Sequence, residues 1–285
     1  MPLYNLYGLK KIIKALLQRN QTPLTKTTHH KNSEHLKRTV TIDLYLPPNY
    51  NKKRSYPLLL LNDGQDLLQM KMEEILTQLY QQNILKPHIT IGIHADKNRM
   101  QEYGTAHQPD YKNRGSKAAA YTQFITKELL QWLQEETHPK HFTQIAIAGF
   151  SLGGLSALDI VWKNPSIFTK VGVFSGALWW RSQPFDEANP DADRIIHTNI
   201  ENGTHHPNLK FWLQTGTNDE TDDRNKNGII DSIDDTNDLI KALQKQGYRQ
   251  PQDIQYTEVQ DGEHNPQTWA KVMPQFLQWC YPASK

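Results

Sequence analysis

From residue 38 onward, short apolar runs typical of strands alternate with amphipathic stretches that have helical spacing. Strands are predicted for residues 38–46, 56–63, 88–95, 144–149, 170–176, 209–216 and 254–259. Helices are predicted for residues 65–82, 117–136, 236–247 and 267–280. Alternation of this kind is typical of a mainly parallel sheet with helices on both faces. The pattern therefore predicts an α/β fold.

The polarity of individual segments predicts where they lie in this sheet. Residues 56–63, YPLLLLND, are almost continuously apolar, which indicates a strand covered on both faces. Residues 38–46, RTVTIDLYL, alternate between polar and apolar and end before two prolines, which favours an edge strand. Residues 179–208 follow neither pattern and are predicted to be irregular.

Residues 1–37 differ from the rest in charge, and we interpret them as a basic extension of a catalytic domain at 38–285. Residues 1–38 contain eight Lys or Arg and one Glu, a net +7, which leaves 24 minus 29, or −5, for the remainder. Near-helical spacing predicts a short amphipathic helix on Leu6, Leu9, Ile13, Leu16 and Leu17. Docking of this helix on the acidic body is favoured over binding to anionic lipid or a partner.

Residues 29–38, HHKNSEHLKR, are predicted to be a polar connector. A solvated loop is the favoured interpretation, although three histidines could bind a metal: His29, His30 and His35.

Composition excludes several classes of protein. Cys280 is the only cysteine, so no internal disulfide can form. The N-terminus lacks the continuous apolar core of a secretory signal, and no stretch reaches the roughly 18–20 apolar residues of a membrane span. We therefore expect a cytoplasmic protein with no transmembrane segment and leave its oligomeric state open. Nucleic-acid binding is set aside because no recognisable module accompanies the basic segment.

The stretch GFSLGG at residues 149–154 follows a predicted strand and precedes a helical run. The pattern G-x-S-x-G in this position is typical of a nucleophile elbow, where small flanking residues permit a turn that exposes the serine. Ser151 is therefore the predicted nucleophile. The alternative is an ordinary strand-to-helix turn in which the serine caps the helix.

A serine nucleophile requires a base and a carboxylate that orients the base. In α/β-hydrolases the chain order is Ser, acid, His. Of twelve histidines, only His264 follows the last predicted strand, so it is the predicted base. The acid should follow the strand at 209–216, where spacing does not choose among Asp219, Glu220, Asp222 and Asp223.

An acyl-transfer site also needs backbone N–H groups that bind the oxyanion. One is expected from Leu152, directly after the nucleophile. The other is expected from Gly64 or Gln65, directly after the strand at 56–63.

Several ordered segments now point to one family. They are LPPNY, YPLLLLNDGQD, AGFSLGG, FSGALWW, GTND and GEHNPQTW. Over about residues 38–282 the chain resembles the esterase family of α/β-hydrolases that includes enterochelin esterases (esterase D-like), feruloyl and acetyl-xylan esterases and mycolyltransferases. The basic extension does not match the family pattern.

The resemblance implies an α/β-hydrolase fold and a serine carboxylesterase that works through an acyl-enzyme. Its triad would be Ser151, Asp219 and His264, because Asp219 matches the acid of feruloyl-esterase-like members. Glu220 is the second choice, because other branches use a nearby glutamate. An acylated sugar or a siderophore-like ester is the implied small-molecule substrate.

Residues 223–234, DRNKNGIIDSID, resemble the calcium loop of an EF-hand or dockerin. The expected oxygen ligands are Asp223, Asn225, Asn227, the backbone carbonyl of Ile229, Asp231 and Asp234. Asp234 replaces the usual glutamate, and its shorter arm should weaken binding unless Asp235 helps. A polar surface loop before a helix is the alternative. Catalysis needs no cofactor, so Ca²⁺ would be structural.

Trp179 and Trp180, in the segment SGALWWRSQPF, are predicted to contact the substrate, with a packed lid base as the alternative. Two other functions remain open from the sequence alone. One is an acyltransferase that uses the same triad, and the other is a non-catalytic calcium-dependent binding module.

Overall fold

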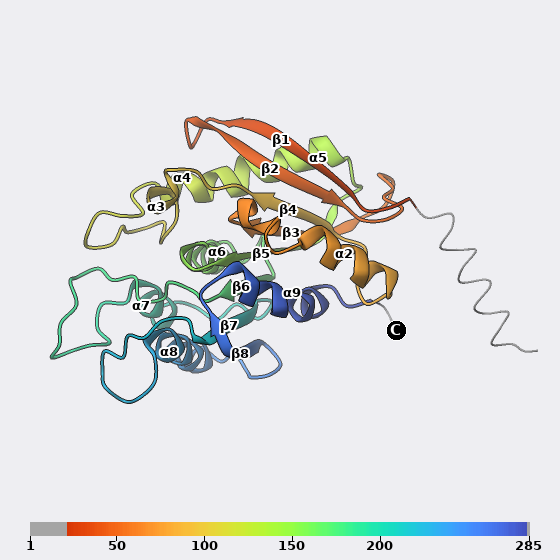
Figure 1. Ribbon diagram of the computed structural model, residues 1–285. Coiled ribbons are helices and arrows are strands. Elements are labelled where there is room, and N and C mark those ends of the chain that lie inside the picture. The colour runs from red at the N-terminus through yellow and green to blue at the C-terminus, as the bar shows by residue number, and fades with distance from the viewer. Residues whose placement is uncertain (1–21, 284–285) are drawn as a thin grey trace, which may run out of the picture.

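The computed structural model describes residues 22–283, which are built around one eight-stranded sheet (Figure 1). The strands are β1 Thr25–Ser33, β2 Arg38–Leu46, β3 Tyr56–Asn62, β4 Ile89–Ile93, β5 Phe142–Phe150, β6 Lys170–Phe174, β7 Lys210–Asn218 and β8 Ile254–Glu263. The helices are the 3₁₀ turn η1 Gly64–Leu67, α2 Met72–Gln81, α3 Arg99–Glu102, α4 Ala118–Gln123, the π-helical η2 Phe124–Leu129, α5 Leu130–Thr137, α6 Leu152–Lys163, α7 Ile195–Glu201, α8 Asp231–Lys245 and α9 Pro266–Cys280.

The strand order is β1-β2-β4-β3-β5-β6-β7-β8. The pairs β1–β2 and β2–β4 are antiparallel, and every pair from β4 to β8 is parallel. A mainly parallel sheet with helices on both faces confirms the predicted fold class. The carboxyl ends of the parallel strands meet at one edge, where open α/β sheets bind ligands.

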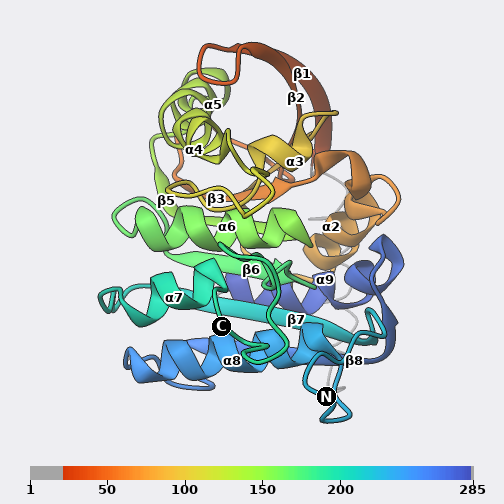
Figure 2. The ribbon, with the colours of Figure 1, turned by 90° about the vertical axis from the view of Figure 1, so that its left-hand side faces the viewer.

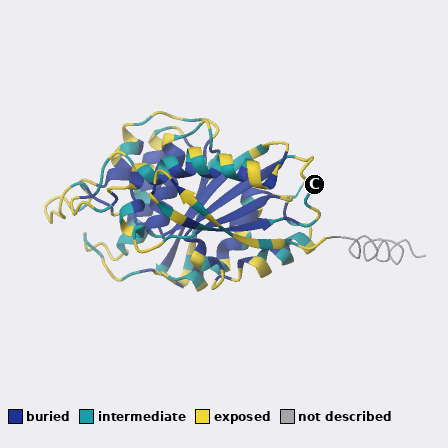
Figure 3. Ribbon diagram, turned by 90° about the horizontal axis from the view of Figure 1, so that it is seen from above, coloured by how far each residue is buried: buried dark blue, intermediate teal, exposed yellow. Residues whose placement is uncertain are grey.

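Successive side chains of β3 point to opposite faces of the sheet, which explains its continuous apolar sequence. Leu58 and Leu60 pack in the core under the helices from α4 to α8, whereas Leu59 and Leu61 pack under α2 and α9. Figure 2 shows these layers, and Figure 3 shows that the buried residues concentrate on the sheet and the inner helix faces. Complete burial of one such leucine contributes about 1.5–3 kcal/mol to folding.

The prediction of a polar connector at residues 29–38 is wrong. Residues 25–33 form β1, which pairs with β2 from Thr25 opposite Leu46 to Ser33 opposite Arg38. Of this strand only Ser33 is buried, so no apolar alternation reveals it in the sequence. The sheet therefore begins at Thr25, while the predicted amphipathic helix lies outside the described residues.

Helix boundaries differ from the sequence prediction in three places. α2 begins at Met72 rather than at residue 65, because Lys71 has a left-handed backbone with φ 57° that separates it from η1. α8 begins at Asp231 rather than at residue 236, since its polar first turn hides the helical pattern. The short α7 lies within the segment predicted to be irregular. Within residues 22–283, no helix has both the length and the apolar character required to cross a membrane.

Candidate active site

Ser151 lies in a strained turn between β5 and α6. Its backbone has φ 54° and ψ −123°, outside the regions that side chains prefer. The turn is held by the N–H of Ser151, which donates to the carbonyl of Phe174 at 2.8 Å. Strain of this kind in a non-glycine residue is typical of functional sites.

The glycines that flank the serine are required by close packing. A Cβ on Gly149 would lie 2.3 Å from the carbonyl oxygen of Gly153. A Cβ on Gly153 would lie 2.5 Å from Oδ2 of Asp63. Both approaches are shorter than any van der Waals contact, so the turn is possible only with glycine at both positions.

The predicted oxyanion donors come from two segments beside this turn. Leu152 is the first residue of α6, where a backbone N–H has no acceptor within the helix. Gly64 opens η1 and lies tightly against β4, because a Cβ there would be 2.5 Å from the carbonyl carbon of Gly92. The side chain of Gln65 is engaged, because its Oε1 accepts from the N–H of Ala95 at 3.0 Å and its Nε2 donates to Oδ1 of Asp63 at 3.3 Å, which leaves its backbone N–H as the available donor.

Asp219 and His264 follow neighbouring parallel strands. Asn218 of β7 pairs with Glu263 of β8. Asp219 and His264, the residues that follow these two, therefore lie at the same edge of the sheet. Asp219 is 9% exposed, and its Oδ2 accepts from the N–H of Gly216 at 2.9 Å. Its Oδ1 is buried with no hydrogen-bond partner among the described residues.

Oδ1 of Asp219 lies on the side toward β8. A Cβ placed on Gly216 would be 2.8 Å from this oxygen and 2.3 Å from the carbonyl oxygen of Gly262, two residues before His264. A free carboxylate oxygen between these strand ends is suited to accept a proton from the imidazole.

Trp269 of α9 connects the imidazole to the nucleophile turn. Its ring meets that of His264 edge-on, with centroids 5.5 Å apart, and stacks on Phe150 at 4.8 Å. Its Nε1 donates to Oγ of Ser175 at 3.0 Å. The sequence analysis missed this residue, since a tryptophan at helical spacing is more often a plain core residue.

The electrostatics of Asp219 and His264 are linked. Burial raises the pKa of Asp219 above its ordinary value of 3.8, while the N–H of Gly216, the nearby hydroxyl of Ser175 and the charge of His264 oppose the rise. Loss of solvent around the imidazole lowers the pKa of His264 below 6.5; Asp219 opposes this effect and Arg99 adds to it. His264 is therefore mainly neutral at pH 7, as a general base must be.

The structure brings Ser151, His264 and Asp219 to one edge of the sheet but does not close the contacts between them. Within residues 22–283, no hydrogen bond joins any two of the three side chains. Contacts of this kind are often long without substrate and tighten when it binds.

The other carboxylates that the sequence offered as the acid line a cavity of about 790 Å³. They are Glu220, Asp222 and Asp223. Burial, followed by the charges of neighbouring carboxylates, raises the pKa of Glu220 to about 7. None of the charges that shift it belongs to His264.

This cavity lies between the segment after β6 and the loop after β7. The segment after β6 forms one wall of the cavity, with the residues Trp179, Arg181, Phe185, Glu187 and Pro190. Ser151, His264 and Asp219 do not line it, and Glu220, which follows Asp219 in the chain, is its lining residue nearest in sequence to these three. Trp179 is 40% exposed there, but Trp180 is fully buried. The predicted substrate contact by Trp180 is therefore wrong, since its ring packs against Gly104 and Gly115.

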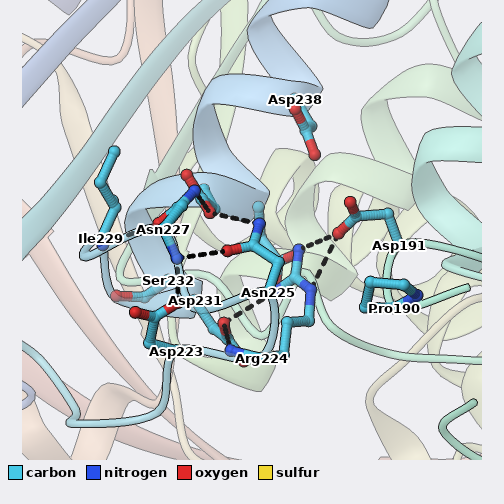
Figure 4. A network of polar contacts seen from close by, with 12 residues as sticks. Pro190, Asp191, Asp223, Arg224, Asn225, Asn227, Ile229, Asp231, Ser232 and Asp238 are labelled. Atoms are coloured by element: carbon cyan, nitrogen blue, oxygen red, sulfur yellow. Dashed lines mark hydrogen bonds and ion pairs between the residues drawn. The ribbon is translucent and has the colours of Figure 1, made fainter. Parts of the chain in front are cut away.

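Four of the six predicted calcium ligands are joined by hydrogen bonds, and three of them, Asp223, Asn225 and Asn227, are labelled in Figure 4. Asp223 accepts from the N–H groups of Asn227 at 3.1 Å and Gly228 at 2.9 Å. The amide groups of Asn225 and Asn227 donate to the same Oδ2 of Asp234, at 3.1 and 2.7 Å. Gly228 has φ 86°, which supplies the sharp turn that the motif requires.

The other two predicted ligands are placed differently. Asp231 is engaged by Arg224, which donates its backbone N–H to Oδ1 at 2.8 Å. The side chain of Ile229 points away from the polar groups, so only its carbonyl could serve (Figure 4). Residues 22–283 contain no cluster of three or more His, Cys, Asp or Glu side chains arranged to hold a metal. Any ion here would depend on amide and carbonyl oxygens as well as carboxylates.

Comparison with known proteins gives a consistent result. The sequence model of the family described as "Putative esterase" matches residues 33–280. The chain is 25% identical over 255 residues to the uncharacterized protein YbbA of Bacillus subtilis (strain 168), covering 87% of this chain and 95% of YbbA.

Solved structures share the fold at lower identity. The enterobactin esterase FES from Shigella flexneri, solved in the presence of enterobactin, is 22% identical with a TM-score of 0.71. The match covers 91% of this chain but only 60% of FES. A ferulic acid esterase is 17% identical with a TM-score of 0.66, covering 91% of this chain and 98% of that one.

Proposed function

The chain belongs to the "Putative esterase" family and is an ester-hydrolysing enzyme, and we propose that it acts as a serine carboxylesterase with Ser151, His264 and Asp219 as its triad. The observation that carries this proposal is the strained turn at Ser151, which presents the serine at the edge where β7 and β8 deliver the acid and the base. The fold and the family support it together.

In this mechanism the neutral imidazole of His264 accepts the proton of Ser151 as the serine oxygen attacks the ester carbonyl. The N–H of Leu152 and that of Gly64 or Gln65 bind the oxyanion of the tetrahedral intermediate. His264 then returns the proton to the leaving alcohol. Water enters, His264 takes a proton from it, and the acyl-enzyme is hydrolysed by the same steps.

Asp219 is the better candidate for the acid. Its free Oδ1 lies between the ends of β7 and β8, where it would accept the proton of the imidazole nitrogen that faces away from the serine. Glu220 faces the cavity instead, with a pKa of about 7. A carboxyl that is half protonated at neutral pH holds the imidazolium poorly.

The cavity beside Asp219 is the proposed site for part of the substrate. Trp179 and Phe185 are 40% and 47% exposed there, and flat aromatic surfaces of this kind favour sugars or planar rings. The carboxylates of the opposite wall can accept hydrogen bonds from hydroxyl groups. An acylated sugar or a siderophore-like ester fits both features, and the relatives that act on enterobactin and ferulic acid support the choice.

The esterase proposal is tested by hydrolysis of short p-nitrophenyl esters and by labelling with a serine-reactive phosphonate. Ser151→Ala should lose both activities, while the exposed Ser166, between α6 and β6, provides the matched control Ser166→Ala. Retention of full activity by Ser151→Ala would exclude Ser151 as the nucleophile. Products formed with added alcohols distinguish hydrolysis from acyl transfer.

We also propose that residues 223–234 bind Ca²⁺ as a structural ion. Oδ1 of Asn225 and Oδ1 of Asn227 accept from the N–H groups of Asn227 and Ile229, at 3.2 and 2.7 Å; a half rotation of either amide would give up that bond and present the oxygen where the nitrogen now lies. Asn225 and Asn227 would then direct oxygens, together with the carboxylates of Asp223 and Asp234, toward a cation between them. The ion would fix a loop that begins four residues after Asp219 and would take no part in acyl transfer.

The short Asp234 arm predicts weak binding, with a Kd on the order of 10⁻⁴–10⁻³ M. Calcium should raise the melting temperature of the wild type and of an Asp261→Asn control, but not that of Asp223→Ala. Asp261 is an exposed carboxylate outside the loop. Equal shifts in all three proteins, or no shift at 10 mM calcium, would show that the loop is only a polar surface turn.

A further inference from the structure

The two segments that carry the proposed oxyanion donors are not adjacent in sequence and must be held in register. We propose that Arg99 is a positioning residue that fixes them together through Asp63. This inference rests on the proposed esterase function, because it assigns Arg99 a role in the oxyanion site beside Ser151.

Asp63 directly precedes the donor segment at Gly64 and Gln65. It has a left-handed backbone with φ 59° and is 1% exposed. Arg99 donates from Nε to Oδ1 at 2.7 Å and from Nη2 to Oδ2 at 2.9 Å. A paired contact of this form fixes direction as well as distance, because both groups are planar.

Arg99 also reaches the nucleophile turn. Its Nη2 lies 3.3 Å from the carbonyl oxygen of Phe150, the residue before Ser151, and donates to it. One guanidinium therefore contacts both sides of the proposed oxyanion site, through the carboxylate of Asp63 and the backbone carbonyl of Phe150. It enters from α3, which follows β4 and belongs to neither segment.

The two segments also pack directly on each other. Oδ2 of Asp63 lies so close to Cα of Gly153 that an added Cβ would be 2.5 Å from it. The neighbouring Asn62 donates from Nδ2 to the carbonyl of Gly153 at 2.8 Å. The hydroxyl of Tyr103 accepts from the N–H of Asp63 at 3.2 Å. Without Arg99, the carboxylate of Asp63 would be buried against α6 with no cation beside it.

A buried carboxylate that loses its cation must shift toward water or bind a proton. Either change moves Asp63 and therefore the N–H groups of Gly64 and Gln65. These donors stabilise the transition state more than the bound ester, because negative charge develops on the carbonyl oxygen only in the transition state. Loss of Arg99 should consequently lower kcat and leave KM nearly unchanged.

The chain provides a matched control on the same helix. Arg38 donates from Nε and Nη2 to Glu102 at 2.8 and 2.6 Å, and Glu102 is 1% exposed. This pair also anchors α3, but it connects the helix to β2 rather than to the nucleophile turn. If Arg99 served only to hold α3 in place, Arg38→Lys would impair catalysis as strongly as Arg99→Lys.

The test measures kcat and KM for a neutral p-nitrophenyl ester with Arg99→Ala, Arg99→Lys, Asp63→Asn and Arg38→Lys. We expect kcat to fall about 10- to 100-fold for Arg99→Ala and Arg99→Lys, with KM within about threefold. Arg38→Lys should stay within about threefold of wild-type kcat. The double variant Asp63→Asn/Arg99→Ala should lose no more than the larger single loss, as expected for residues acting as one unit.

A second readout is the affinity for a neutral trifluoromethyl ketone, which forms a tetrahedral adduct with serine. It should weaken in parallel with kcat/KM in the Arg99 variants, while binding of the product alcohol stays unchanged. In Arg99→Ala the acidic limb of the pH profile should also move to higher pH, because the positive charge that helps to lower the pKa of His264 is gone. Melting curves check that each variant is folded, and Arg99→Lys decides the question if Arg99→Ala does not fold.

The proposal is overturned if Arg99→Lys keeps wild-type kcat, if Arg38→Lys loses as much kcat, or if the loss appears only as a raised KM for anionic esters. The last result would instead make Arg99 a contact for a charged substrate. These outcomes are separate from failure of the proposed function, which would appear as no ester hydrolysis and no phosphonate adduct in the wild type, or as full activity in Ser151→Ala.

Discussion

Replacement of Asp219 by asparagine keeps the shape of the side chain and removes its charge. The amide oxygen of the variant can still accept from the N–H of Gly216, which now binds Oδ2 at 2.9 Å. The amide nitrogen then lies where Oδ1 faces the end of β8, and it cannot accept a proton from His264. The imidazole loses the partner that selects its tautomer and stabilises its charged form.

The expected loss in kcat is about 10³- to 10⁴-fold, by analogy with the same change in other triads. At about 1.4 kcal/mol for each factor of ten, this corresponds to roughly 4–5.5 kcal/mol of transition-state stabilisation. Burial raises the pKa of Asp219, so keeping this carboxylate ionised at neutral pH costs the folded state some stability. A neutral asparagine should therefore not lower the melting temperature at pH 8.

The assay is hydrolysis of a p-nitrophenyl ester at pH 8, with melting curves recorded for each variant. Glu220→Gln is the matched control, because it removes a carboxylate from the adjacent residue that faces the cavity. We expect its kcat for a small ester to stay within about threefold of the wild type. If Asp219→Asn kept more than a tenth of kcat while Glu220→Gln lost it, Glu220 would be the acid and the reasoning from strand register would be refuted.

Three further predictions concern single residues. The kcat/KM profile should rise to a plateau through a pKa below 6.5, since burial lowers the pKa of His264 and only its neutral form acts as a base; a midpoint above 7 would contradict this. Burial raises the pKa of Asp159 from 3.8 to about 6, so its ionisation costs stability as pH rises through this range. The free energy of unfolding of Asp159→Asn, measured by urea titration, should therefore exceed that of the wild type by up to about 3 kcal/mol at pH 8, with no gain near pH 3. Gly149→Ala places a Cβ 2.3 Å from the carbonyl oxygen of Gly153 and should lower the free energy of unfolding by several kcal/mol. An unchanged midpoint in the same titrations would contradict this prediction.

The sequence predicted the nucleophile turn well because local steric limits determine it. Gly149 is needed because a Cβ there would meet the backbone of Gly153, and a Cβ on Gly154 would lie 3.0 Å from the carbonyl oxygen of Gly149, so the spacing of these glycines follows from the turn itself. The continuous apolar run of β3 likewise reports burial on both faces. Signals of this type depend only on neighbours in the chain.

Features that depend on distant pairing could not be predicted in this way. β1 is polar because most of its side chains face solvent, and only its backbone pairing with β2 makes it a strand. Trp179 and Trp180 are identical neighbours, yet one lines the cavity and the other is fully buried. The pairing of Arg99 with Asp63 joins the ends of β3 and β4, and no local pattern announces it.

The choice between Asp219 and Glu220 shows why register decides function at this edge. Asp219 and Glu220 follow β7 in a bend where the N–H of Asp219 donates to the carbonyl of Gly216 at 3.3 Å, and only Glu220 lines the cavity. The pairing of Asn218 with Glu263 places Asp219 beside the end of β8, whereas Glu220 lines the cavity. In the proposed mechanism one carboxylate therefore orients the base, while its neighbour faces the cavity. A shift of this pairing by one residue would exchange the two roles without changing the composition of the loop.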